Sequence, residues 1–203
     1  MKMKLVATTL SAVTLFSSAA FGMDFDPKFY VGAEAQVDKL KHGKNFVDTN
    51  NKSLVRKNTP AADLFVGTRL NENFGLEAGY TAMKKSSKTD LSAVPNTKTT
   101  VKMHNTHIDA IGYLPVCDDI DLIGSVGVGR LTTKVGVKQT NGTAVELANL
   151  KKFSKSKAGV RLGIGAQYNI TSNVGARVML RHQKGNKVVK SVNSLGAGLF
   201  YQF

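Results

Sequence analysis

The chain has 203 residues, and its 28 Lys and Arg against 14 Asp and Glu give a formal net charge of +14. Hydrophobic residues make up 42% of it and charged residues only 21%, which excludes a disordered polyelectrolyte and leaves one domain or two small ones. A single cysteine excludes a disulfide scaffold and a cysteine-based zinc site, and we expect no cofactor or metal.

The first 22 residues have the pattern of an export signal. A short basic stretch with Lys2 and Lys4 precedes an uncharged run over 5–20, which is too short and too rich in Ser and Thr for a membrane anchor. Small residues favour cleavage after Gly22, with cleavage after Ala20 as the alternative. We therefore expect a signal peptide over 1–22 and one domain over 23–203, with a net charge of 14 − 2 = +12.

A period of two runs through the rest of the chain. In the first segment Val31 and Ala33 alternate with Gly32 and Glu34, which is typical of a strand with two unlike faces. The same alternation recurs until the chain ends, and it predicts eight strands. The segments are 29–38, 62–70, 74–82, 108–114, 122–129, 158–168, 174–181 and 194–203.

The predicted connections alternate in length. Tight turns are expected at 71–73, 115–121 and 169–173, and longer connections at roughly 40–60, 85–100, 132–155 and 184–190. Short turns at one end and long loops at the other are typical of a transmembrane β-barrel. Asn141-Gly142 predicts a hairpin that extends two strands beyond the membrane, and two further membrane strands are the alternative.

A soluble all-β sandwich also alternates, and three observations argue against it. The less apolar face is rich in glycine, which suits the narrow interior of an eight-stranded barrel. The apolar face is nearly free of charge, as lipid contact requires. Aromatic residues lie on that face at the short-turn end and predict an interfacial girdle. These aromatics are Phe29, Phe74, Tyr168, Tyr201 and Phe203.

The last strand carries a family resemblance. Gly198, Tyr201 and the terminal Phe203 lie in the sequence Gly-Leu-Phe-Tyr-Gln-Phe, which resembles the signal read by the assembly machinery of bacterial outer-membrane barrels. Over roughly 25–203 the chain resembles the small eight-stranded family that includes the membrane domain of OmpA, OmpX and opacity-type surface proteins. The resemblance implies an all-β, antiparallel, up-and-down transmembrane barrel in the outer membrane of a Gram-negative bacterium. Members are mostly structural or adhesive, and a few modify lipids.

The alternation of inward and outward positions along the strands places seven charged residues inside this barrel. We expect Glu34 and Asp109 near mid-height with Arg161 and Arg181, because unpaired charges in a confined interior cost several kcal/mol. Glu77 is expected lower, with Arg177 and Arg69 as its neighbours. The network predicts a plugged structural core, since eight strands enclose too little space for an open pore. A narrow channel for small or hydrophobic solutes is the alternative.

Positive charge gathers in the predicted long loops, and the short-turn end is acidic. Extracellular loops of this kind suit the phosphates of lipopolysaccharide or a host polyanion, or form a solvated basic rim on the lipid headgroups. Export and the lack of a groove-reading motif argue against nucleic acid. We expect a monomeric surface protein with a structural role, and adhesion through the basic loops is the further role that they suggest. The basic loop residues are Lys52, Arg56, Lys57, Lys84, Lys85, Lys151 and Lys152.

The sequence contains few arrangements of residues that could form a catalytic site. His104 and His107 point to opposite faces of a strand and cannot chelate one metal, while His107 and Asp109 share the inner face. The His-x-Ser arrangement of barrel-embedded lipid deacylases is absent, so we expect no enzyme. Cys117 lies in a short turn and is interpreted as a surface thiol.

Overall fold

The computed structural model describes residues 27–42, 58–90, 96–140, 146–185 and 189–203, and the regular structure in them is β-strand. No helix among these residues is long and apolar enough to cross a membrane. The predicted signal peptide at 1–22 lies outside the described residues and remains a prediction.

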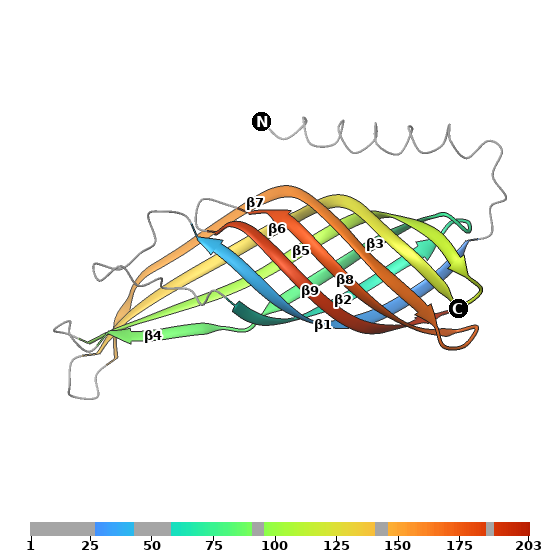
Figure 1. Cartoon of the computed structure of the whole chain (residues 1–203). Coiled ribbons are helices and arrows are strands. Elements are labelled where there is room, and N and C mark those ends of the chain that lie inside the picture. Colours follow the sequence, from blue (N-terminus) through green and yellow to red (C-terminus); the bar gives the residue numbers. More distant parts are fainter. Residues whose placement is uncertain (1–26, 43–57, 91–95, 141–145, 186–188) are drawn as a thin grey trace.

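The strands form one closed antiparallel sheet in which chain neighbours pair and β1 pairs with β9 (Figure 1). β4 continues β3 along β5 after a short break, so nine segments make eight barrel positions, and the predicted up-and-down eight-stranded barrel is confirmed. The strands are β1 (Lys28–His42), β2 (Asn58–Arg69), β3 (Phe74–Met83), β4 (Ser86–Asp90), β5 (Asn96–Cys117), β6 (Ile120–Thr140), β7 (Glu146–Asn169), β8 (Val174–Lys184) and β9 (Val189–Gln202).

The register fixes how strongly the strands tilt. Hydrogen-bonded partners followed once around the barrel from Asn58 return to β2 at Thr68, which is 68 − 58 = 10 residues further along. Eight strands with a shift of ten residues require a tilt of about 40° to the barrel axis. This tilt brings side chains from distant parts of the sequence to one level of the lumen.

Three strands are longer than the alternation predicted. β5 begins at Asn96, β6 ends at Thr140 and β7 begins at Glu146, and together with β4, which pairs with the start of β5, they project beyond the other strands at one end (Figure 1). The long connection expected at 85–100 is therefore wrong in extent. Its Lys-rich and Thr-rich sequence hides the period of two. The extension of two strands towards Asn141-Gly142 is confirmed, because β6 and β7 pair as far as Thr140 and Glu146, and the turn itself lies outside the described residues. The alternative with two further membrane strands is also wrong, because β6 and β7 run on without a break.

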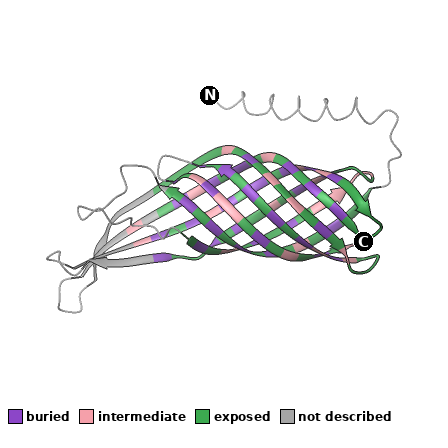
Figure 2. Cartoon of the chain, viewed as in Figure 1, coloured by how far each residue is buried: buried purple, intermediate pink, exposed green. Residues whose placement is uncertain are grey.

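The two faces of the sheet divide as the parity rule predicts, with buried and exposed residues alternating along each strand (Figure 2). Apolar side chains such as Leu64, Ile108 and Ile164 lie outside with more than 60% of their surface exposed. The aromatics of the short-turn end, including Phe29 and Phe203, also face outward. This outer face is apolar where a soluble sheet would be wet, so it is suited to lipid.

Large aromatic side chains fill the lumen near the short-turn end by lying over glycines. A Cβ on Gly32 would lie 2.1 Å from the ring of Phe65, and one on Gly175 would lie 2.1 Å from the ring of Phe200. Phe65 and Phe200 each make an edge contact with Tyr30, at 6.1 Å between ring centroids. The inner glycines therefore provide the room for a packed aromatic layer. A second buried cluster is Ile111, Tyr113, Ile123 and Met179.

Apolar side chains also close the lumen at the long-loop end. Leu131 and Val189 are fully buried there in a cluster of seven residues, with Ala61 packed against it. Between this cap and the aromatic layer lies a polar middle section, whose hollow holds only about 10 Å³. The charged residues inside the barrel are thus sealed from water on both sides. The cap consists of Leu40, Met83, Val101, Met103, Leu131, Val189 and Val192.

Candidate functional site

The polar middle section is organised around Arg177 of β8. Its guanidinium binds Glu77 of β3 with both terminal nitrogens, at 2.5 and 3.0 Å, and binds Glu34 of β1 through Nε. Arg181 holds the same Glu34 carboxylate at 2.5 and 3.0 Å. All four side chains are buried, so these are charge-assisted contacts in a dry environment, where pairing is obligatory.

Glycines in the register make these pairs possible. Glu34, Gly198 and Arg177 follow one another on neighbouring strands, and a Cβ on Gly198 would lie 2.5 Å from Glu34 Cγ. Asp109, Gly127 and Arg161 repeat the arrangement on β5, β6 and β7, with the hypothetical Cβ 2.2 Å from Asp109 Oδ1. Arg161 Nε then lies 3.2 Å from Asp109 Oδ2. In each case a charged side chain reaches its partner across the empty glycine position.

His107 is the member of this section that we did not place in the network. Its Nε2 lies 3.2 Å from Asp63 of β2, and its Nδ1 lies 3.2 Å from Asp109. Gly79 and Gly129 flank it in the register; Gly79 leaves space for the ring, because a Cβ there would lie 2.5 Å from it, and the side chain of Gln183 lies over Gly129. Asp38 and Asp63, both fully buried, were also missed. Parity alone would have found them, because both lie on the same face as Glu34.

Arg69 is placed differently from our expectation. It binds Asp121 at 2.9 Å near the short-turn end, and its guanidinium stacks over Tyr113 at 4.4 Å. It therefore does not neighbour Glu77. Arg161 lies against Asp109 and Arg181 against Glu34, which is the group of four in which we expected them. The cause of the difference at Arg69 is the tilt of the strands. Because of it, the height of a side chain in the lumen cannot be judged from its position along its own strand.

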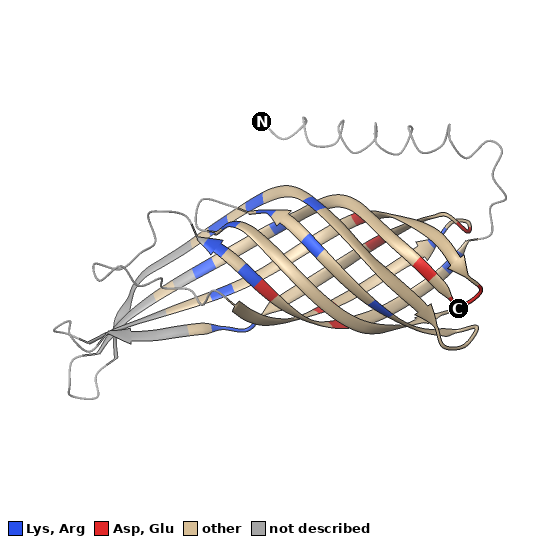
Figure 3. Cartoon of the chain, viewed as in Figure 1, with Lys and Arg blue, Asp and Glu red and all other residues tan. Residues whose placement is uncertain are grey.

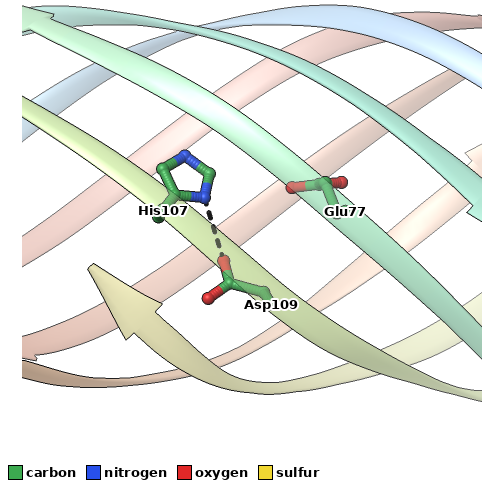
Figure 4. Close-up of side chains that lie close together, drawn as sticks. All are labelled: Glu77, His107 and Asp109. Atoms are coloured by element: carbon green, nitrogen blue, oxygen red, sulfur yellow. Dashed lines mark ion pairs between the residues drawn. The ribbon is translucent and has the colours of Figure 1, made fainter. Parts of the chain in front are cut away.

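Glu77, His107 and Asp109 offer ligand atoms within 4.8 Å of one another, as a metal site would (Figure 4). Both oxygens of Glu77 already accept bonds from Arg177, and Tyr30 donates to one of them at 3.2 Å. A divalent cation would have to displace that guanidinium and lie close to Arg161. The cluster is therefore better described as part of the ion-pair network.

The outer wall at the long-loop end has the opposite electrostatic character (Figure 3). Lys102 of β5 and Lys134 of β6 are direct cross-strand partners, both exposed, and Arg130 lies on the same face of β6. Arg130 Nε donates to Ser156 of β7 at 2.8 Å. Among the residues whose side chains are described, every carboxylate lies in the lumen or at the short-turn end, so the described part of this wall carries basic groups and no acidic ones.

The predicted basic loop residues are placed only in part. Lys84 and Lys85 lie exposed between β3 and β4. Lys52, Arg56 and Lys57 lie outside the described residues. Lys151 and Lys152 lie on β7 by their backbone, and their side chains are outside the described part. At the other end, Tyr201 and Phe203 face outward and their rings meet edge to face at 5.1 Å.

The remaining candidates do not form a catalytic arrangement among the described residues. His104 stacks on Tyr80 at 5.8 Å on the outer face, while the two ring nitrogens of His107 face carboxylates inside. Cys117 is an exposed thiol beside the turn between β5 and β6. It lies at the rim of an open hollow of about 1030 Å³ at the short-turn end, together with Asp118 and Asp119.

A closed, tilted, eight-stranded barrel with an apolar exterior defines a transmembrane β-barrel. The family model described as "Outer membrane protein beta-barrel domain" matches residues 8–203, so the chain belongs to this family of outer-membrane proteins. No match was found among curated proteins.

Solved structures show the same fold at low sequence identity. OprG from Pseudomonas aeruginosa has a TM-score of 0.61 at 10% identity, over 88% of this chain and 97% of its own. Neisserial surface protein A has a TM-score of 0.55 at 20% identity, over 86% and 97%. Ail, the attachment invasion locus protein of Yersinia pestis, solved in complex with the heparin analogue sucrose octasulfate, has a TM-score of 0.52 at 16% identity, over 89% and 100%.

Proposed function

We propose that this outer-membrane barrel is a structural surface protein whose basic end binds polyanions, such as the phosphates of a glycolipid or the sulfates of a host glycan. The observation that carries the proposal is the direct opposition of Lys102 and Lys134, with Arg130 on the same wall. Like charges directly opposite each other on a sheet repel and destabilise it. An anion bound between them converts that repulsion into attraction.

Two further facts support this proposal. The wall carries no carboxylate among the described side chains, so an arriving polyanion meets no repulsive group there. Ail, which shares the fold, was solved in complex with a heparin analogue, and binding of a polyanion by this chain agrees with the charge of its long-loop end. Short turns of such barrels face the periplasm and long loops the exterior, which puts the basic end outside the cell.

Binding of the refolded full chain to immobilised heparin and to lipopolysaccharide tests the proposal. The double variant Lys102→Gln with Lys134→Gln should bind heparin at least about fivefold more weakly, and affinity of the unmodified protein should fall steeply with salt. Lys28→Gln at the short-turn end is the matched control. Equal binding by the double variant and the control would reject the proposal.

A channel is the alternative function, and the packing of the lumen argues against it. The apolar cap and the aromatic layer enclose the ion pairs, and the hollow between them holds only about 10 Å³. The unmodified protein in a planar bilayer should show no large, stable conductance. Arg161→Ala should not create one, because Leu131 and its neighbours in the cap remain in place.

We further infer that residues 1–22 are removed on export, that the last strand is read by the assembly machinery, and that the barrel is a monomer without enzymatic activity. The carboxylate partners of His107 support the last point. Deletion of Phe203 should lower the fraction that reaches its heat-modifiable form in membranes. Unchanged lipid mass after overexpression is the expected result for a protein that is not a lipid-modifying enzyme.

A further inference from the structure

The outer wall formed by β1, β8 and β9 carries a second basic patch, separate from Lys102 and Lys134. Two neighbouring register rows cross these strands, and their side chains are exposed or half-buried on the outer face. Each row has a basic residue on β1 and another on β8, with a small polar residue of β9 between them. The lower row is Lys39, Asn193 and His182, and the upper row is Lys41, Ser191 and Lys184.

The dimensions of this patch suit one phosphate group. Adjacent strands lie about 4.8 Å apart and alternate residues about 6.6 Å apart, so the four basic residues start from the corners of a rectangle of roughly 10 by 7 Å. Their side chains are long enough to converge on its centre. There His182 Nδ1 and Asn193 Oδ1 are hydrogen-bonded at 2.5 Å, which leaves the amide NH₂ of Asn193 as a donor.

An apolar groove begins directly below the patch. The wall is hollowed by about 710 Å³, with Lys39, His182 and Asn193 at its polar end. The next register row towards the membrane centre is Val37, Leu195, Leu180 and Ile164. The row after that is Ala62, Ala35, Ala197, Val178 and Ala166, whose short side chains keep the surface low.

The basic patch and the apolar groove together determine which ligand fits. A soluble polyanion or inorganic phosphate would contact only the basic patch, and an uncharged lipid would contact only the groove. An anionic lipid uses both, because its phosphate lies at the headgroup level while its acyl chains lie along the wall. Among the described residues, the carboxylates of Asp38, next to Lys39 on β1, and of Asp63 are fully buried in the lumen and do not compete for the basic side chains.

We propose that the β1–β8–β9 wall binds one phosphorylated lipid of the outer leaflet, with its phosphate between Lys39, Lys41, His182 and Lys184 and an acyl chain over Leu180 and Leu195. This proposal rests on the proposed function for the outward orientation of the long-loop end and for a phosphorylated glycolipid as a ligand, and it adds a second, separate site for that ligand. It does not require that the protein bind soluble polyanions.

The test uses the full chain in detergent with lipid A as the probe, and native mass spectrometry reads the retained lipid. The unmodified protein should retain one molecule of diphosphorylated lipid A in preference to the dephosphorylated form. Lys39→Gln with Lys184→Gln should weaken retention roughly ten- to thirtyfold. The control, Lys28→Gln at the short-turn end, should retain lipid A normally. Lys102→Gln with Lys134→Gln should lose heparin binding but weaken retention of the single lipid A molecule less than Lys39→Gln with Lys184→Gln does.

Three results would overturn the proposal. They are equal retention by the Lys39/Lys184 variant, equal retention of the dephosphorylated lipid, and competition by millimolar inorganic phosphate alone. A photoactivatable group at Leu195 should crosslink to an acyl chain, and crosslinking to a second copy of the protein would show instead that the groove is a dimer contact. Heat-modifiable gel migration of each variant confirms that it has folded.

Discussion

The sealed middle of the lumen and the outer wall at the long-loop end use charge in opposite ways. Inside, Arg177 and Arg181 share the carboxylates of Glu34 and Glu77, and apolar layers exclude water on both sides. Outside, Lys102 faces Lys134, and the neighbouring partners are hydroxyl groups. Among the described residues, a charged side chain is therefore structural where it lies against an opposite charge. It is available to a ligand where its neighbours are like charges or hydroxyl groups.

The strongest way to break the inner network is Arg177→Ala. It leaves Glu34 and Glu77 without their shared guanidinium in a dry lumen, and should lower the free energy of unfolding by about 3–5 kcal/mol. Urea titration of the refolded barrel, followed by heat-modifiable gel migration, measures the change. Arg69→Ala, whose partner Asp121 lies near the wet end, should cost clearly less. Equal costs would contradict the view that the middle is sealed.

A cation on the lipid-facing wall tests the boundary between the two regions. Val126 lies outward near the middle of the membrane-crossing part of β6, and Val126→Arg should cost about 2–4 kcal/mol of folding free energy in lipid. A lysine at Thr132, level with the basic end, should cost little. Folding titrations into lipid vesicles compare the two variants, and similar losses would show that the hydrocarbon boundary lies elsewhere.

Filling a glycine gap should disturb an ion pair without removing a charge. A Cβ at Gly127 meets both Asp109 Oδ1 and the backbone oxygen of Ile108 at 2.2 Å, so Gly127→Ala should displace that carboxylate, push β5 and β6 apart locally and cost about 1–3 kcal/mol. Gly124 lies on the same strand with nothing within 4 Å of a hypothetical Cβ, and Gly124→Ala is the control. Matching urea midpoints for the two variants would refute the role of the gap.

The smallest expected effect has the opposite sign. Lys134→Gln removes the like charge facing Lys102 and should stabilise the protein by about 0.2–1 kcal/mol in low salt. The same variant should bind heparin more weakly, so stability and binding move in opposite directions. Urea midpoints with and without added heparin measure both. A loss of stability without heparin would mean that Lys134 has a structural partner.

Sequence parity was sufficient to separate the two faces of every strand. Glu34, Asp109 and Arg161 were assigned to the lumen because they share a face with closely spaced glycines, and the structure places them there. Asp38, Asp63 and His107 lie on the same inward face of their strands, so the alternation would also have assigned them to the network. The extension of β6 and β7 was predicted from Asn141-Gly142, whereas the start of β5 at Asn96 was not, because alternation fades where neither face contacts lipid.

The order of apolar and polar residues thus determined by itself that this chain forms an outward-apolar barrel, since lipid and a narrow lumen each select one side of a strand. Which charges meet was decided only by the closed sheet. A shift of ten residues around eight strands brings Arg177 to Glu34 across Gly198, and Lys39 to the level of His182 through Asn193. The sequence of a single strand does not reveal this ten-residue shift in register, because the shift arises only when the sheet closes into a barrel.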